Sequence, residues 1–173
     1  MKNIILQHWA GPMNELVEKS TESIKVYAES IGADYEFIRG IVFMPKIAHK
    51  LDYPCQKLIY LDEKYDEYYY VVMVDADMFV AKNCNQNIFT DDVGIGRHTA
   101  IQTALRKNLV GLYPDYGSED APYWGGSVFR LSREIRQKFR AALTEDIVIA
   151  FARRYSDERV LLCLENKVGM KIT

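Results

Sequence analysis

Two aspartates separated by one residue, Asp75 and Asp77, are the side chains of this chain best placed to do chemistry. On an extended strand, residues two apart project to the same side at about 6 to 7 Å, so both carboxylates would aim at one spot. Carboxylates this close repel each other unless a cation lies between them, and their oxygens suit Mg²⁺ or Mn²⁺ completed by waters and phosphates. The alternative is that both residues simply form a turn, as aspartate often does.

An apolar run stands directly before this pair. The residues from Tyr69 to Val74 are aromatic or aliphatic and include no charged or amide side chain. Such a run is typical of a central parallel strand that is covered on both faces. Ligands of open α/β sheets bind beyond the carboxyl ends of the strands, which is where Asp75 and Asp77 are expected to lie. A metal-bound diphosphate is the ligand that fits two carboxylates at this edge.

The spacing of apolar residues predicts the elements that lead up to this strand. Ile4–Leu6 is expected to form a buried first strand. From Met13 to Ile31 apolar residues recur at steps of three and four, which predicts an amphipathic helix that ends at Gly32. Tyr35–Ile38 is expected to form the second strand. The chain therefore begins with a strand, a helix and a strand.

The rest of the chain continues this alternation. A second helix is expected to start at Pro54 and to include Tyr65, and a strand is expected at Val128-Phe129. Later helices are expected to start at residues that favour the N-cap, namely Ser132, Thr144 and Ser156. The alternation predicts an α/β fold with a mostly parallel central sheet flanked by helices. A length of 173 residues suits a single domain over residues 1–173.

Composition and charge argue against several classes of partner. The formal net charge of -2 and the absence of a basic face disfavour nucleic acid. The cysteines lack the spacing of a zinc site or a disulfide framework, which favours a reducing compartment; they are Cys55, Cys84 and Cys163. The apolar stretch at the N-terminus is too short for a signal peptide or a membrane span. We therefore expect a soluble, cytoplasmic protein.

Several segments resemble the signature of GT-A glycosyltransferases. Val71–Val80 is similar to the family's hydrophobic strand with Asp-x-Asp, and Lys57–Tyr60 and Tyr65-Asp66 match the segments before it. Tyr123–Phe129 is similar to the segment that lines the sugar site, and Asp157-Glu158 is similar to the family's acidic pair. Among these enzymes, the chain most resembles the small ones of large DNA viruses. The resemblance implies a Rossmann-like GT-A domain that transfers a sugar from a nucleotide-sugar, with a UDP-sugar favoured.

By this resemblance, the ends of the strands would hold the nucleotide and its metal. Asp77 would bind Mn²⁺ or Mg²⁺, and Asp75 would contact the ribose or the metal, while the small Ala76 leaves the approach open. Lys57 would reach the nucleotide. The base and ribose would rest on the end of the first strand, on Gln7, His8 and Trp9.

The other two segments would contact the sugar and the acceptor, a glycan or protein-glycan. Trp124 would stack on a sugar beside Gly125 and Gly126, although a tryptophan before a turn is often a core residue. Asp157 and Glu158 would hydrogen-bond hydroxyls, act as a base or stabilise a developing oxocarbenium ion. The alternative is that both carboxylates only favour the first turn of a helix.

One departure from the family pattern concerns the metal site. Many metal-dependent relatives supply a third protein ligand near the C-terminus, often histidine, whereas Val168–Thr173 contains no such residue. The two aspartates therefore predict an incomplete site that needs the phosphates of the nucleotide. Met170–Ile172 is similar to a strand cut short, so the chain can also be interpreted as a fragment of a longer protein.

Two other functions stay open from the sequence. Phosphatases of the haloacid dehalogenase type also carry Asp-x-Asp after an apolar strand and use the first aspartate as nucleophile. They expect Thr or Val where Phe79 stands, and they usually place that strand at the N-terminus. A module that binds a nucleotide-sugar without turning it over would retain both aspartates.

Overall fold

Four strands form one sheet in the computed structural model, which describes residues 1–90, 125–151 and 156–169. They are β1 (Asn3–Trp9), β2 (Asp34–Arg39), β3 (Tyr70–Asp75) and β4 (Val128–Ser132), in the spatial order β2-β1-β3-β4. β1 runs parallel to both β2 and β3, whereas β4 is antiparallel to β3. The prediction of an α/β fold with a mostly parallel sheet is confirmed for these residues.

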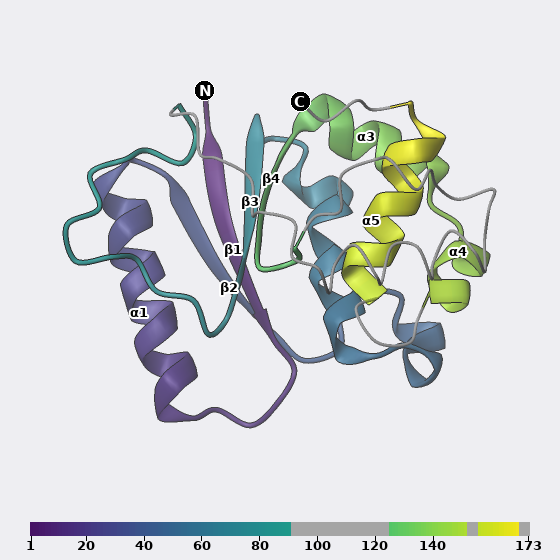
Figure 1. Ribbon diagram of the computed structural model, residues 1–173, viewed down its shortest axis with the longest axis horizontal. Helices are drawn as coiled ribbons and strands as arrows, with labels where there is room; N and C mark the ends of the chain where they lie inside the picture. The colour runs from purple at the N-terminus through teal and green to yellow at the C-terminus, as the bar shows by residue number, and fades with distance from the viewer. Residues whose placement is uncertain (91–124, 152–155, 170–173) are drawn as a thin grey trace.

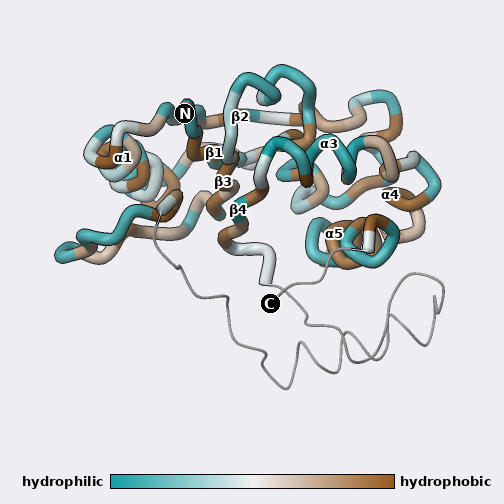
Figure 2. Tube along the Cα trace, turned by 90° about the horizontal axis from the view of Figure 1, so that it is seen from above, coloured by the Kyte–Doolittle hydropathy of each residue, from teal (hydrophilic) through white to brown (hydrophobic). Residues whose placement is uncertain are grey.

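Helices lie on both faces of the sheet (Figure 1). One face carries α1 (Glu15–Ser30). The other face carries the 3₁₀-helices η1 (Pro45–Lys50), η2 (Tyr53–Leu61) and η3 (Glu63–Tyr65) and the helices α3 (Arg133–Ala142), α4 (Glu145–Phe151) and α5 (Ser156–Lys167). Figure 2 shows the strands between α1 and the group α3, α4 and α5. None of the helices in the described ranges combines the length and the apolar character that crossing a bilayer demands.

The first helix follows the predicted pattern closely. The Asn14 side chain caps α1 by accepting a hydrogen bond from the backbone N–H of Val17 at 3.0 Å. The helix ends before Gly32, which has a φ of 69° that suits a residue without a side chain. Its buried face includes Ile24 and Ala28, which pack toward the sheet.

The strand β3 is covered on both faces, as its apolar sequence predicts. Val71 and Met73 point into the larger core, which lies between the sheet and the layer of η2, α3, α4 and α5. Val72 and Val74 point into the smaller core beneath α1. Because side chains alternate along a strand, Asp75 falls on the same face as Val71 and Met73, toward the larger core.

The predicted second helix is wrong in its form. The segment folds as two short 3₁₀-helices, η2 and η3, separated at Asp62. Asp62 has an extended backbone with φ of -61° and ψ of 143°, and its side chain accepts a hydrogen bond from the backbone N–H of Lys64. An aspartate that caps a new turn in this way breaks a continuous helix.

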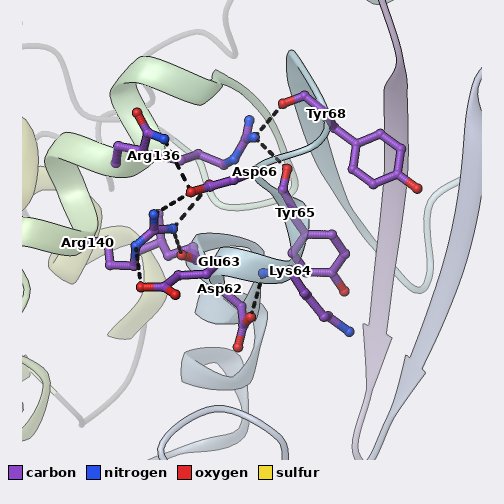
Figure 3. A network of polar contacts seen from close by, with 10 residues as sticks. Asp62, Glu63, Lys64, Tyr65, Asp66, Tyr68, Arg136 and Arg140 are labelled. Atoms are coloured by element: carbon purple, nitrogen blue, oxygen red, sulfur yellow. Dashed lines mark hydrogen bonds and ion pairs between the residues drawn. The ribbon is translucent and has the colours of Figure 1, made fainter.

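Two arginines of α3 hold this segment in place (Figure 3). The buried guanidinium of Arg136 donates to the carbonyl oxygens of Tyr65 at 2.9 Å and Tyr68 at 2.7 Å. Arg140 donates to the Asp66 carboxylate at 2.6 Å. Burial lowers the pKa of Arg136 to about 10, so the side chain still carries its charge at neutral pH. α3 therefore holds the segment between η2 and β3 in place, and with it the relative position of these two elements.

Candidate functional site

The Asp-x-Asp segment forms a turn at the end of β3. The strand ends at Asp75, and the backbone N–H of Met78 donates to the Asp75 carbonyl at 3.1 Å. Asp77 therefore lies in a turn and not on an extended strand, so the strand geometry expected for the two carboxylates is wrong. The Asp77 side chain is exposed and forms no hydrogen bond or ion pair with a described residue, whereas Asp75 is half-buried.

The start of β4 passes beside this turn. The backbone N–H of Asp75 donates to the carbonyl oxygen of Ser127 at 2.8 Å. This contact places Gly126 alongside the end of β3, although Asp75 and Gly126 are far apart in the sequence. Gly125 precedes it, and Trp124 lies outside the described residues.

Lys57 joins the predicted segments into one cluster. Its ammonium nitrogen lies 2.7 Å from Asp75 Oδ1, 2.5 Å from Asp157 Oδ2 and 2.8 Å from the carbonyl oxygen of Gly126. These residues come from η2, the end of β3, the turn before β4 and the start of α5. The tertiary structure thus brings Asp75 of the Asp-x-Asp segment and Asp157 of the later acidic pair to the same lysine.

Gly126 fits closely against the first turn of α5. Its backbone N–H donates to Glu158 Oε1 at 2.6 Å. A Cβ atom at this position would lie 2.5 Å from Asp157 Oδ2 and 2.9 Å from Glu158 Cγ, which is closer than atoms in proteins approach. The site therefore requires a glycine at 126 because the two acidic side chains fill the space that a Cβ would need.

Burial and charge oppose each other inside the cluster. Lys57 is 9% exposed and Asp157 is 3% exposed. Burial raises the pKa of Asp157, and the Lys57 charge works against this rise. Burial alone would lower the pKa of Lys57, but the carboxylates of Asp157 and Asp75 outweigh it and raise the pKa. Lys57 therefore remains a cation at neutral pH.

The end of β1 contributes residues of different kinds. His8 pairs with Asp75 across the sheet, and its Nε2 lies 2.7 Å from the carbonyl oxygen of Gly40. Burial lowers the pKa of His8, which favours the neutral ring. The Trp9 ring nitrogen donates to the Pro12 carbonyl at 2.9 Å, at an exposed position.

Gln7 lies on the α1 face of the sheet and is fully buried. Its amide nitrogen donates to Ser20 Oγ at 3.1 Å and to the carbonyl oxygen of Asp75 at 3.0 Å. Its amide oxygen accepts from the Tyr35 hydroxyl at 2.8 Å. Gln7 therefore holds the backbone at the end of β3 from the face of the sheet that α1 covers.

A divalent cation would find an incomplete set of ligands here. Among the described residues, no group of three or more His, Cys, Asp or Glu side chains could hold a metal ion. One carboxylate oxygen of Asp75 is engaged by Lys57, and Asp77 is exposed beside it. Two carboxylates at one turn fit Mg²⁺ or Mn²⁺ when phosphate oxygens and waters supply the other ligands.

Two contacts that position the cluster carry no signal in the sequence. The Ser156 hydroxyl donates to the Asp52 carboxylate and so joins the starts of α5 and η2. The Gln56 amide oxygen accepts from the backbone N–H groups of Val42 and Phe43, both at 2.8 Å. No motif in the sequence marks Ser156 or Gln56 as a partner of these groups, so the contacts become visible only in the folded structure.

Comparison with known proteins finds a similar fold among the solved structures. No family model matches the chain, and no curated protein matches its sequence. The chain is similar to the crystal structure of a glycosyltransferase involved in the glycosylation of the major capsid of PBCV-1, with a TM-score of 0.57 and 13% sequence identity. The alignment covers 99% of this chain and 80% of that one. At this identity the likeness concerns the fold, and this chain shares the α/β fold of that glycosyltransferase.

Proposed function

We propose that the chain is a metal-dependent glycosyltransferase of GT-A type. It would move a sugar from a nucleotide-sugar, with a UDP-sugar favoured, to a hydroxyl of a glycan or protein-glycan acceptor. The observation that carries this proposal is the contact of Lys57 with Asp75, Asp157 and Gly126. It unites at one point the segments that resemble the nucleotide, sugar and acidic motifs of such enzymes. The fold likeness to a solved glycosyltransferase supports the same proposal.

The residues of the cluster suggest how the chain would handle its substrates. Asp77 and the second oxygen of Asp75 would hold Mn²⁺ or Mg²⁺, which when bound neutralises a leaving diphosphate. Asp75 would hold that metal, and through it the diphosphate, at a fixed position, because Lys57 restrains its other oxygen. Glu158 is less buried than Asp157 and would orient the acceptor hydroxyl or the sugar from the first turn of α5.

The test is a transfer and hydrolysis assay with UDP- and GDP-sugars in the presence of Mn²⁺. We expect release of nucleotide from one of these donors, and we expect Asp77→Asn to lower the rate by about 100-fold or more, because a metal ligand is lost. Asp146→Asn is the matched control, since Asp146 is an exposed aspartate of α4, and its rate should equal that of the wild type.

The same assay separates the alternatives. Wild-type transfer that persists in the Asp77→Asn variant with metal present would contradict the proposed site. Hydrolysis of a phosphate monoester without any use of nucleotide-sugars would indicate a phosphatase with Asp75 as nucleophile. Donor binding without turnover, seen by calorimetry, would indicate a nucleotide-sugar-binding module.

A further inference from the structure

The ammonium of Lys57 is surrounded by three oxygens of the protein. A protonated lysine carries three N–H groups. Its nitrogen lies within hydrogen-bonding distance of three acceptors, at 2.7 Å from Asp75 Oδ1, 2.5 Å from Asp157 Oδ2 and 2.8 Å from the Gly126 carbonyl. It donates hydrogen bonds to Asp75 and Gly126 and forms an ion pair with Asp157, and its side chain is only 11% exposed, so a phosphate oxygen has little room to reach it. The geometry therefore disfavours the direct contact with the nucleotide that the family resemblance implies.

The cluster is open to solvent at one end. The side chains of Lys57 and Asp157 are 11% and 4% exposed, whereas that of Asp75 is 28% exposed. A ligand that approaches the turn after β3 would meet Asp75 first. Asp157 is more deeply buried than Asp75. Its carboxylate occupies the space that a Cβ atom at position 126 would need.

We propose that Lys57 is a positioning residue that fixes Asp75 for a metal-bound diphosphate, and that Asp157 serves as the buried counter-ion of Lys57 without touching a sugar. This inference rests on the proposed function. It divides the acidic residues into two groups: Asp75, Asp77 and Glu158 face the substrates, and Asp157 acts through Lys57.

The fold supplies independent anchors for this arrangement. Ser156 bonds to Asp52, which ties the start of α5 to the start of η2 without help from the ion pair. The backbone N–H of Gly126 holds Glu158 at 2.6 Å. These neighbouring contacts hold Lys57 close to Asp157. Lys57 in turn holds the Asp75 carboxylate through its hydrogen bond to Oδ1. A carboxylate whose orientation is set by a second hydrogen bond makes a better metal ligand.

A pair of variants separates positioning from simple charge neutralisation. Lys57→Met alone would leave the Asp157 carboxylate buried without a counter-ion and would lower the melting temperature. The double variant K57M/D157L replaces the buried pair by apolar side chains, which often restores stability. We expect the double variant to fold, by circular dichroism, and to bind UDP with Mn²⁺ about tenfold or more weakly by calorimetry. Lys64→Met is the control, because Lys64 is 50% exposed, and its affinity should equal that of the wild type.

The outcomes are distinct from one another. A folded double variant with the wild-type affinity would show that Lys57 only neutralises Asp157, which would overturn the inference. A wild-type protein that binds neither UDP- nor GDP-sugars with Mn²⁺ would instead overturn the proposed function, and the inference with it.

A second variant keeps the test decisive if the double variant does not fold. Asp157→Asn preserves the volume of the side chain and can still accept a hydrogen bond from Lys57. We expect it to retain about a tenth or more of the wild-type kcat, with its main loss in affinity for the metal-bound donor. A fall in kcat of about 100-fold with an unchanged KM for the donor would make Asp157 a catalytic group and would overturn the inference.

Discussion

At the scale of single residues, Lys57 is the side chain that gives the acidic motifs a common location. Asp75 and Asp157 stand far apart in the sequence, and each has an ordinary alternative interpretation, as a turn residue or as a favourable residue of a first helical turn. Their shared contact with one buried ammonium is not explained by either alternative. A buried ion pair of this kind gives little net stability, so its role in positioning is the stronger explanation.

Gly126 provides the sharpest test at this scale. Gly126→Ala would force a Cβ to within 2.5 Å of Asp157 Oδ2, so α5 or the acidic side chains must move. Overpacking of a buried site costs about 1–3 kcal/mol, and we expect urea denaturation to show a loss of this size together with loss of transfer. Ser127→Ala is the control for stability, since the Ser127 side chain is exposed. Unchanged stability and activity in Gly126→Ala would contradict the close fit described here.

At the scale of elements, α3 decides where η2 and β3 lie. Arg136 donates to the carbonyl oxygen of Leu131 in β4 and to those of Tyr65 and Tyr68, so it joins two segments that are far apart in the sequence and both precede the helix. Figure 3 shows Arg136 and Arg140 reaching the same short stretch of chain from α3. Lys57 sits on the helix directly before this stretch, so the position of the lysine depends on a contact that involves no residue of the site.

Removal of the Arg136 guanidinium tests this dependence. Arg136→Met would leave several buried carbonyl oxygens without their donor, and we expect the free energy of unfolding to fall by about 3 kcal/mol. Urea denaturation measures this change. Arg133→Met is the matched control on the same helix, because Arg133 is exposed and its side chain donates to the Glu67 carbonyl at the surface; its loss should be small. Equal losses in the two variants would show that Arg136 does not organise this region.

At the scale of the whole molecule, α1 covers one face of the sheet, and the helices that carry the site cover the other (Figure 1). The lysine, the glycine turn and the start of α5 all lie on the side of the larger core, next to the carboxyl end of β3. This is the edge at which open α/β sheets bind their ligands. The described residues supply carboxylates to that edge but no third metal-ligating side chain.

The incomplete ligand set predicts that metal and nucleotide stabilise the protein together. Mn²⁺ alone should barely change the melting temperature, whereas Mn²⁺ with UDP at about 100 times its Kd should raise it by about 5–10 °C. The physical reason is that phosphate oxygens must complete the coordination that Asp75 and Asp77 begin. A thermal melt with and without EDTA measures the effect. An equal rise with Mn²⁺ alone would show that the protein itself holds a complete metal site.

Much of the framework could be predicted from the sequence, because periodicity and capping are local properties. The pattern from Met13 to Ile31, the glycine at 32 and the apolar run before Asp75 suffice to place α1 and β3. The N-cap at Ser132 is also confirmed, since its side chain accepts a hydrogen bond from the Ile135 backbone N–H. Such signals lie within a few residues of the structure that they determine.

Only the tertiary structure decided how the site is assembled. The sequence could nominate Lys57, Asp75, Gly126 and Asp157, but it could not show that a single ammonium binds all of the other three. It also placed Asp77 on a strand, whereas the turn closed by Met78 ends the strand at Asp75. Contacts across such sequence separations depend on how the sheet and helices pack, and packing leaves no periodic trace in the chain. The sequence alone therefore revealed the short acidic motif, whereas the tertiary structure was needed to show that Lys57 is its counter-ion.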